Sequence, residues 1–183
     1  MSKILVDTID TRSGTSNITI GSSNASQITL KSGATLTNFP ANTPAFYAYA
    51  TTGTSIAFAT NVKINLQAEY FDTDSAFDTS NARFTCPTGK AGKYFFNGQV
   101  AFSATITDNH VGFAKNGSTT VVGGSYDTFF EAKGANASTV NTSVIIDLAA
   151  GDYVEMFTFN TNGSVPTTST GRTRFIGYKL AGV

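Results

Sequence analysis

The sequence predicts an all-β domain, a jelly-roll sandwich of about ten strands. From residue 45 to the C-terminus, short apolar or alternating segments recur between turns rich in Gly, Pro and Asn. No window of twelve or more residues carries a convincing helical stripe. The hydrophobic fraction of 40% is enough for a core, while the charged fraction of 13% is low for a globular protein. The surface must therefore consist largely of Thr, Ser, Asn and Gly.

The expected strands alternate with turns along the whole segment from residue 45 to the C-terminus. In chain order they are Phe46–Tyr49, Ile56–Phe58, Val62–Leu66, a strand ending at Phe84–Cys86, Tyr94–Phe102, Val111–Lys115, Thr119–Val122, Val140–Leu148, Tyr153–Phe159 and Arg174–Leu180. Asn116-Gly117 is the strongest hairpin signal in the chain. Many short strands with frequent turn signals indicate a sandwich or jelly roll.

The stretch Ala82–Gly98 contains the sharpest break between two strands. Pro87 lacks an N–H and fits only where a ladder ends or lies at an edge. Gly89 and Gly92 allow the chain to reverse. The consecutive aromatics Tyr94-Phe95-Phe96 suit a strand covered on both faces, by the core on one side and by a subunit interface on the other.

Residues 1–40 differ from the rest of the chain, and Pro40 and Pro44 mark the boundary. The segment repeats short Ile/Thr alternations stopped by small residues, which indicates either strands wound around a threefold axis or a disordered arm. Its first apolar residues are candidates for attachment to a particle: Ile4, Leu5, Val6 and Ile9. We therefore expect an attachment arm at 1–40 and a jelly-roll head at 41–183.

The charges favour an assembly over a nucleic-acid or membrane partner. Twelve basic and twelve acidic residues cancel, which leaves no basic excess to hold phosphates or anionic lipids. A net charge near zero also favours association. The start of the chain resembles neither a signal peptide nor a membrane span, and no stretch approaches twenty apolar residues. We expect no membrane insertion.

Several motifs in order resemble a known family. They are Phe84-Thr85-Cys86-Pro87, Gly92-Lys93-Tyr94-Phe95-Phe96, Ala114-Lys115-Asn116-Gly117, Leu148-Ala149-Ala150-Gly151-Asp152-Tyr153-Val154 and Arg174-Phe175-Ile176-Gly177-Tyr178-Lys179-Leu180. Across residues 45–183 the chain resembles the globular head of the q subunit of the first complement component, which shares the tumour-necrosis-factor-like jelly roll. The resemblance implies a compact trimer that binds partners without catalysis.

The N-terminal segment departs from that family. It lacks the Gly-X-Y period of a collagen stalk. Its opening, SKILVDTIDTRSGTSNITIG, instead resembles structural proteins of tailed phages, especially marine and cyanobacterial ones. That resemblance implies a virion protein made in the host cytoplasm and released by lysis.

The resemblance and the aromatic pattern together suggest two groups of binding residues. The expected trimer-interface residues are Phe46, Tyr47, Tyr94, Phe96 and Tyr178, and the partner-binding candidates are Phe129, Phe130 and Asn162. Core packing or trimer contact is the commoner role of adjacent phenylalanines such as Phe129 and Phe130. Asn162 lies in a long polar loop of the kind that often carries recognition.

Residues that could carry chemistry are few. Cys86 is the only cysteine and is expected to be a buried small hydrophobe, and His110 is the only histidine, so neither a disulfide nor a triad is expected. Asp72, Asp74 and Asp78 could offer oxygens to calcium, but the Gly and closing Glu of an EF-hand are missing, which favours solvated turn acids. We therefore expect no cofactor and no enzymatic activity.

The leading hypothesis is a trimeric phage virion protein, a capsid decoration (cement) or head-fibre protein whose partners are its own copies and the major capsid protein. A tail-fibre tip or receptor-binding adhesin that recognises a host-surface glycan is nearly equal. A soluble lectin-like module unconnected with a virion is a further alternative, and an enzyme is the least favoured.

Overall fold

A computed structural model gives the conformation of Ser32 and of residues 42–57, 59–106, 109–118, 130–132, 137–160, 165–166 and 171–181. The chain divides into two compact units, Met1–Phe39 and Pro40–Val183. The attachment candidates Ile4, Leu5, Val6 and Ile9 lie outside the described residues, so the predicted arm stays a prediction.

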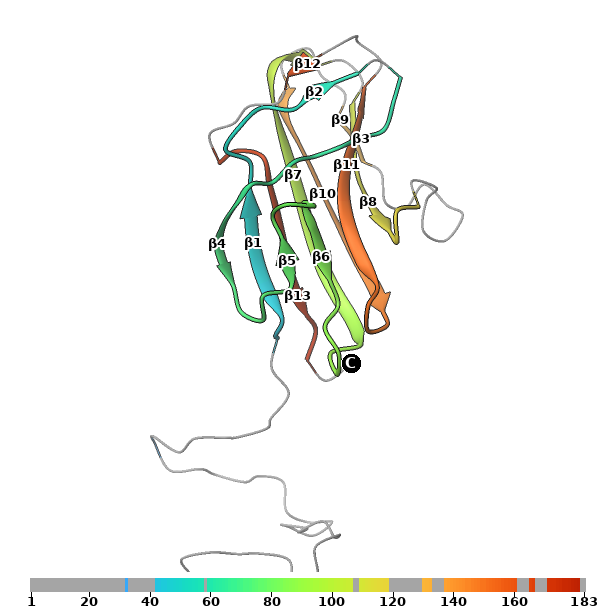
Figure 1. Cartoon of the computed structure of the whole chain (residues 1–183). Helices are drawn as coiled ribbons and strands as arrows, with labels where there is room; N and C mark the ends of the chain where they lie inside the picture. The colour runs from blue at the N-terminus through green and yellow to red at the C-terminus, as the bar shows by residue number, and fades with distance from the viewer. Residues whose placement is uncertain are drawn as a thin grey trace, which may run out of the picture. The chain divides into compact units, whose positions relative to one another are not determined.

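The second unit is a sandwich of two antiparallel sheets (Figure 1). The five-stranded sheet has the order β10 (Ala137–Leu148), β7 (Gly92–Ile106), β13 (Arg174–Lys179), β1 (Ala45–Tyr49) and β4 (Ala68–Asp72). The six-stranded sheet has the order β5 (Phe77–Asp78), β6 (Arg83–Thr85), β11 (Tyr153–Asn160), β8 (Asn109–Lys115) and β9 (Phe130–Ala132), and β3 (Val62–Lys63) also pairs with β11. β12 (Val165–Pro166) and β2 (Ser55–Ile56) form a separate pair. The predicted all-β jelly roll is confirmed.

Aromatic side chains fill the space between the two sheets. The Phe46 ring stacks on Phe77 with centroids 4.9 Å apart and meets Phe175 edge-on at 4.9 Å. Phe84 of the opposite sheet stacks on Phe46 at 5.2 Å, and Phe96 lies 5.5 Å from Phe84. These rings supply a large buried apolar area and specific edge-to-face contacts, so they hold the two sheets together.

Two strand glycines make room for these rings. A Cβ at Gly177 of β13 would lie 2.5 Å from Phe96 and 2.6 Å from Phe46. A Cβ at Gly98 of β7 would lie 2.6 Å from Met156 Sδ. The inner face therefore accepts only glycine at these positions without displacing a neighbour.

The observed elements differ in detail from those predicted. Within the expected strand Val62–Leu66 only β3 has strand pairing, although Ile64 and Leu66 are fully buried as the alternation indicated. β4 was not predicted, because its sequence AEYFD breaks the apolar alternation. Asn116 and Gly117 both have positive φ, 53° and 73°, as a tight turn after β8 requires. Phe58 and the expected strand Thr119–Val122 lie outside the described residues.

Polar contacts fix the turn that follows β10. The Asp152 carboxylate accepts hydrogen bonds from Asn116 Nδ2 at 2.8 Å and from the Ala149 N–H at 2.9 Å, and it pairs with Lys115 Nζ at 2.7 Å. Asn116 Oδ1 accepts the Tyr153 N–H at 2.9 Å. Because these bonds favour the charged carboxylate, the Asn116 amide first and Lys115 next, they lower the pKa of Asp152 to about 2.

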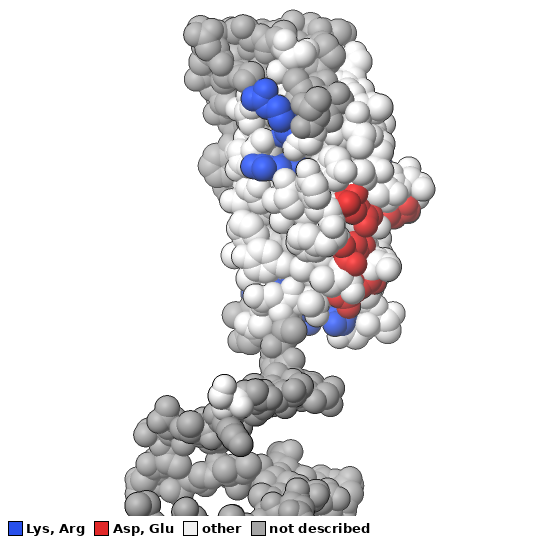
Figure 2. Space-filling model, turned by 90° about the vertical axis from the view of Figure 1, so that its left-hand side faces the viewer, with Lys and Arg blue, Asp and Glu red and all other residues white. Residues whose placement is uncertain are grey.

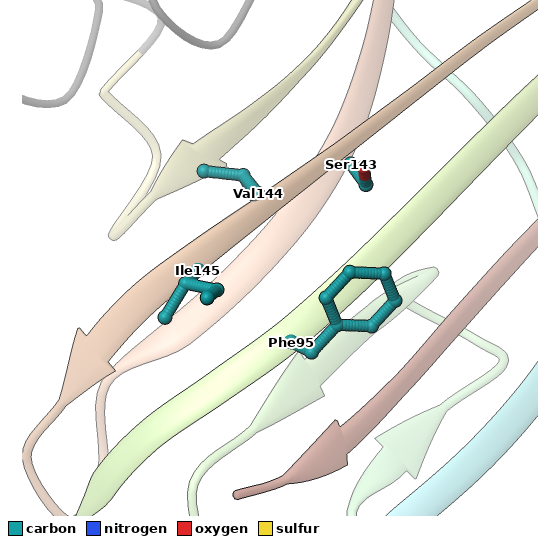
Figure 3. Close-up of a pocket in the computed structure, with 4 residues that line it drawn as sticks. All are labelled: Phe95, Ser143, Val144 and Ile145. Carbon is teal, nitrogen blue, oxygen red and sulfur yellow. The ribbon is translucent and has the colours of Figure 1, made fainter.

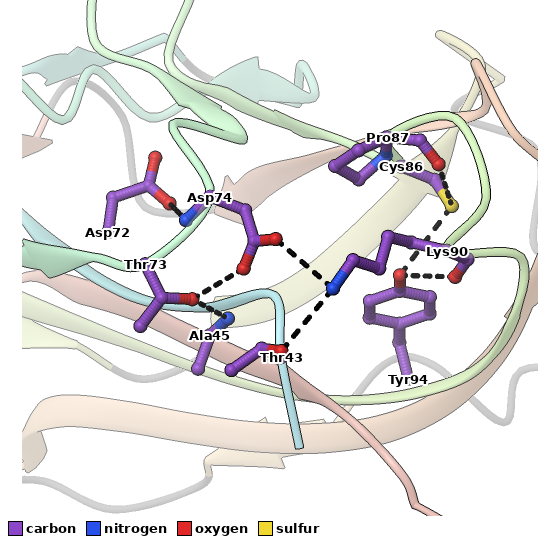
Figure 4. A network of polar contacts seen from close by, with 9 residues as sticks. All are labelled: Thr43, Ala45, Asp72, Thr73, Asp74, Cys86, Pro87, Lys90 and Tyr94. Carbon is purple, nitrogen blue, oxygen red and sulfur yellow. Dashed lines mark hydrogen bonds and ion pairs between the residues drawn. The ribbon is translucent and has the colours of Figure 1, made fainter. Parts of the chain in front are cut away.

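A second polar network holds the start of the jelly roll (Figure 4). Lys90 Nζ lies 3.3 Å from Asp74 Oδ1 and donates to Thr43 Oγ1 at 3.4 Å. Thr73 Oγ1 accepts the Ala45 N–H at 3.0 Å and donates to Asp74 Oδ2 at 2.7 Å. The residues that lead into β1 are thus tied to the turn after β4 and to the loop before β7.

Candidate interaction surface

The face of the five-stranded sheet that points away from the core carries an unusual share of apolar side chains. Along each strand alternate residues are buried in the core and the others face outward. The strand register sorts the outward residues into three cross-strand rows, from β10 to the other edge. The first row is Ile145, Phe95, Tyr178 and Ala45; the second is Ser143, Asn97, Ile176, Tyr47 and Phe71; the third is Asn141, Gln99, Arg174, Tyr49 and Ala68.

Four rings form an aromatic ridge at the β1–β4 edge of this face: Tyr47, Tyr49, Tyr70 and Phe71. Tyr70 stacks on Tyr49 with centroids 4.5 Å apart and meets Tyr47 edge-on at 4.8 Å. The strand register shifts between Tyr47 and Ala48, which places Tyr70 between the second and third rows. Tyr70 is 65% exposed and Phe71 47% exposed, so the ridge presents its rings at the surface.

The opposite edge of the same face contains an open hollow of about 380 Å³ lined by Phe95, Ser143, Val144 and Ile145. Figure 3 shows Phe95 of β7 and Ile145 of β10 on neighbouring strands, in agreement with their pairing in the register. Phe95 also packs against Tyr178 at 5.3 Å. Ile145 is 58% exposed, so an apolar wall of the hollow is open to a partner.

Polar side chains occupy the centre of the face. Arg174 donates from Nη2 to Gln99 Oε1 at 2.9 Å and from Nη1 to the Tyr47 hydroxyl at 3.3 Å. Asn97 and Asn141 exchange side-chain hydrogen bonds at 3.0 and 3.2 Å. The face thus combines two apolar patches at its edges with fixed amide and guanidinium groups at its centre.

The structure corrects three of the five predicted trimer-interface residues. Phe46, Tyr94 and Phe96 are completely buried between the sheets and have no surface left for a neighbouring subunit. Tyr94 also donates to the Lys90 carbonyl at 2.6 Å, and burial followed by its contact with Cys86 raises the pKa of its hydroxyl. Tyr47 and Tyr178 lie on the outer face, and their interface role stays a prediction.

The interface candidates missed from the sequence are Phe95, Ile145, Tyr70 and Phe71. In the sequence, Phe95 stood out only as the middle residue of the apolar triplet Tyr94-Phe95-Phe96. Because side chains alternate along a strand and Tyr94 and Phe96 are buried between the sheets, Phe95 lies on the outer face of β7. No sequence signal marked β4 as an edge strand.

The partner-binding candidates are not brought together by the described part of the chain. Phe129 and Asn162 lie outside the described residues. Phe130 begins β9, and its side chain also lies outside the described part. Their role stays a prediction.

The acidic residues near β4 act as turn-stabilising groups. Asp72 Oδ2 accepts the Phe77 N–H at 2.7 Å, and Asp78 accepts bonds from Asn81 and the Ser80 N–H. The Asn81 amide is the main reason that the pKa of Asp78 is lowered. Figure 2 views the β4 side of the jelly roll and shows acidic side chains gathered in a band beside a largely uncharged surface.

Cys86 and His110 both make contacts within the folded domain. Cys86 is buried, and its Sγ lies 3.6 Å from the Tyr94 hydroxyl. His110 lies in β8, where its carbonyl accepts the Thr158 hydroxyl at 2.7 Å and its ring meets Phe159 edge-on. Among the described residues, no group of three or more His, Cys, Asp or Glu side chains could hold a metal ion. The described part of the chain also has no helix long and apolar enough to cross a membrane.

The described residues form a two-sheet jelly roll whose outer face carries two apolar patches. Residues 45–180 match the model of the C1q domain, and the chain belongs to the C1q domain family. Domains of this family and of the related TNF-like fold form homotrimers and are typically non-enzymatic. A comparison with curated protein sequences found no significant match.

Solved structures share the fold at low sequence identity. The globular domain of the zebrafish complement 1qA protein has a TM-score of 0.54 at 14% identity, covering 75% of this chain and 97% of that one. Murine APRIL has a TM-score of 0.54 at 14% identity, covering 74% and 98%. The PRD1 vertex protein P5 has a TM-score of 0.52 at 12% identity, covering 74% and 94%. These likenesses establish the jelly roll.

Proposed function

We propose that the protein is a non-enzymatic structural component of a phage virion and works as a homotrimer. Residues 41–183 form the outward-facing head, and residues 1–40 attach it to the particle through Ile4, Leu5, Val6 and Ile9. Its virion partner is the major capsid protein, so the protein serves as a capsid decoration or head-fibre protein. It is made in the host cytoplasm and released by lysis.

The observation that carries the proposal is the outer face of the five-stranded sheet. The large hydrophobic side chains that are exposed in the described part of the chain, Tyr70, Phe71 and Ile145, all lie on this sheet. An exposed apolar face with fixed polar groups marks an interaction site. Homotrimer formation by C1q-like domains makes further copies of the chain its most suitable partner.

The virion assignment has two supports. The opening of the chain resembles tailed-phage structural proteins, and the fold is shared with a protein whose name places it at a vertex, the PRD1 vertex protein P5. The low content of charged residues fits a protein that functions inside an assembly.

Light scattering of the purified chain tests the trimer, and quantitative mass spectrometry of purified particles tests the virion role. We expect three times the mass of the chain in solution, and a copy number tied to capsid lattice positions. Tyr178→Glu, on the outer face, should give monomers with an unchanged circular dichroism spectrum, while Thr88→Glu, in an exposed turn, should remain trimeric. A few copies per particle would indicate a tail-fibre tip or adhesin instead, and absence from particles would leave a lectin-like module.

A further inference from the structure

We propose that Phe71 of one subunit inserts into the hollow formed by Phe95, Ser143 and Ile145 of the next subunit, so that the trimer closes through one repeated head-to-tail contact. The inference rests on the proposed trimer and specifies which two patches of the sheet meet. A ring of this kind needs two different, complementary surfaces on each chain.

The two surfaces lie at opposite edges of the five-stranded sheet. β4, which carries the aromatic ridge, is one edge strand, and β10, which carries Ser143 and Ile145, is the other. The ridge protrudes, with Phe71 47% exposed, and the other edge is hollowed. Phe71 has no polar group that would be left unpaired in a hollow lined by Phe95 and Ile145, whereas the Tyr70 hydroxyl would need a partner.

The strand register places the two surfaces at nearly the same level. If the threefold axis runs along the strands, a rotation about it leaves the height of every residue unchanged, so the patches that meet in a closed ring must lie at about the same height. Phe71 and Ser143 belong to the same cross-strand row, through Tyr47, Ile176 and Asn97, and Phe95 and Ile145 lie in the adjacent row. Patches at widely different heights would lead to an open filament, so this arrangement favours closure.

The family supplies the argument for a second copy as the occupant, because C1q-like domains form homotrimers. The acidic residues of β4 do not obstruct this contact. Glu69 and Asp72 pair with the inward residues Ala48 and Phe46, so they lie on the opposite face of β4 from Phe71.

Disulfide trapping tests the contact. Within one chain Phe71 and Ser143 are separated by four strand spacings, roughly 19 Å, which is too far for an intrachain disulfide. The native Cys86 is buried. In the double variant Phe71→Cys/Ser143→Cys, mild oxidation should produce a covalent trimer on a non-reducing gel. Each single-cysteine variant should stay uncrosslinked. The control Phe71→Cys/Asp147→Cys should also stay uncrosslinked, because residue 147 is on the same face of β10 as Ser143 but two cross-strand rows away from it.

A charge exchange provides an independent readout. Phe71→Glu should raise the protein concentration at which the trimer dissociates by at least about tenfold, and Phe71→Glu/Ser143→Lys should restore part of that loss. If the double-cysteine protein is trimeric by light scattering yet stays uncrosslinked, or if Phe71→Cys alone crosslinks, the insertion is wrong while the proposed trimer stands. A monomeric wild-type chain overturns both.

Discussion

Phe95 and Phe96 are neighbours in β7 whose replacement should have different consequences, the first mainly for the trimer and the second for the fold of the subunit. Phe96 is completely buried and packs against Phe46, Phe84 and Phe175. Truncating such a ring to alanine removes its transfer free energy and leaves a cavity, at a cost of about 3–5 kcal/mol. Phe95 faces outward and is only half-buried within the subunit, so Phe95→Ala should cost about 1 kcal/mol in an isolated head.

The assay is urea unfolding followed by far-ultraviolet circular dichroism, because the chain has no tryptophan. With a loss of about 4 kcal/mol and a urea dependence of about 2 kcal/mol per M, the midpoint of Phe96→Ala falls by about 2 M. A trimer that unfolds to monomers is more stable at higher protein concentration. We expect the wild-type midpoint to rise with concentration and the Phe95→Ala midpoint to lose much of that rise.

Two outcomes would contradict these assignments of Phe95 and Phe96. If Phe95→Ala lowers the midpoint as much as Phe96→Ala at every concentration, the outward assignment of Phe95 is wrong. If Phe96→Ala leaves the midpoint unchanged, the aromatic core is not what stabilises the sandwich.

Three further substitutions test the fold. Gly177→Ala forces a methyl group against two core rings and should cost about 1–3 kcal/mol, seen as a lower thermal midpoint; an unchanged midpoint would contradict the packing. The folded-state pKa of Asp152 is lowered from 3.8 to about 2, chiefly by the hydrogen bond from Asn116. The ionised Asp152 carboxylate therefore stabilises the folded protein fully above about pH 4, and this contribution is lost as the pH falls toward 2. The gap in urea midpoint between wild type and Asp152→Asn should therefore narrow over that range, and a constant gap would refute the linkage. The buried Glu155 carboxylate lies 2.8 Å from Lys63 Nζ, and Lys63→Met removes this cation. Because Lys63 is partly exposed, the substitution should lower the free energy of unfolding by about 1–3 kcal/mol. The double variant Lys63→Met/Glu155→Leu should recover part of the lost stability, and a double variant less stable than Lys63→Met would argue against a buried-charge penalty.

Much of the fold could be predicted from local patterns, because a turn motif or an alternation of apolar and polar residues occupies only a few consecutive residues. Asn116-Gly117 gave the turn after β8, and the long strands around Phe96 and Ile146 lay where apolar residues were dense. β4 escaped prediction because Glu69, Tyr70 and Phe71 do not alternate. A strand of this kind is defined by its pairing with β1, a contact between segments about twenty residues apart that no local pattern encodes.

The aromatic pattern alone does not assign the interface, because alternation divides a strand into two sets of residues without saying which set is inside. Tyr94-Phe95-Phe96 is apolar on both faces, so hydrophobicity does not decide. The glycines do: Gly98 is two residues beyond Phe96, and Gly177 is two beyond Phe175, so in each strand a ring and a glycine share a face. A face that must give up a Cβ is one that another side chain approaches closely. In both strands that face is the buried one, which leaves Phe95 on the face that a second subunit can reach.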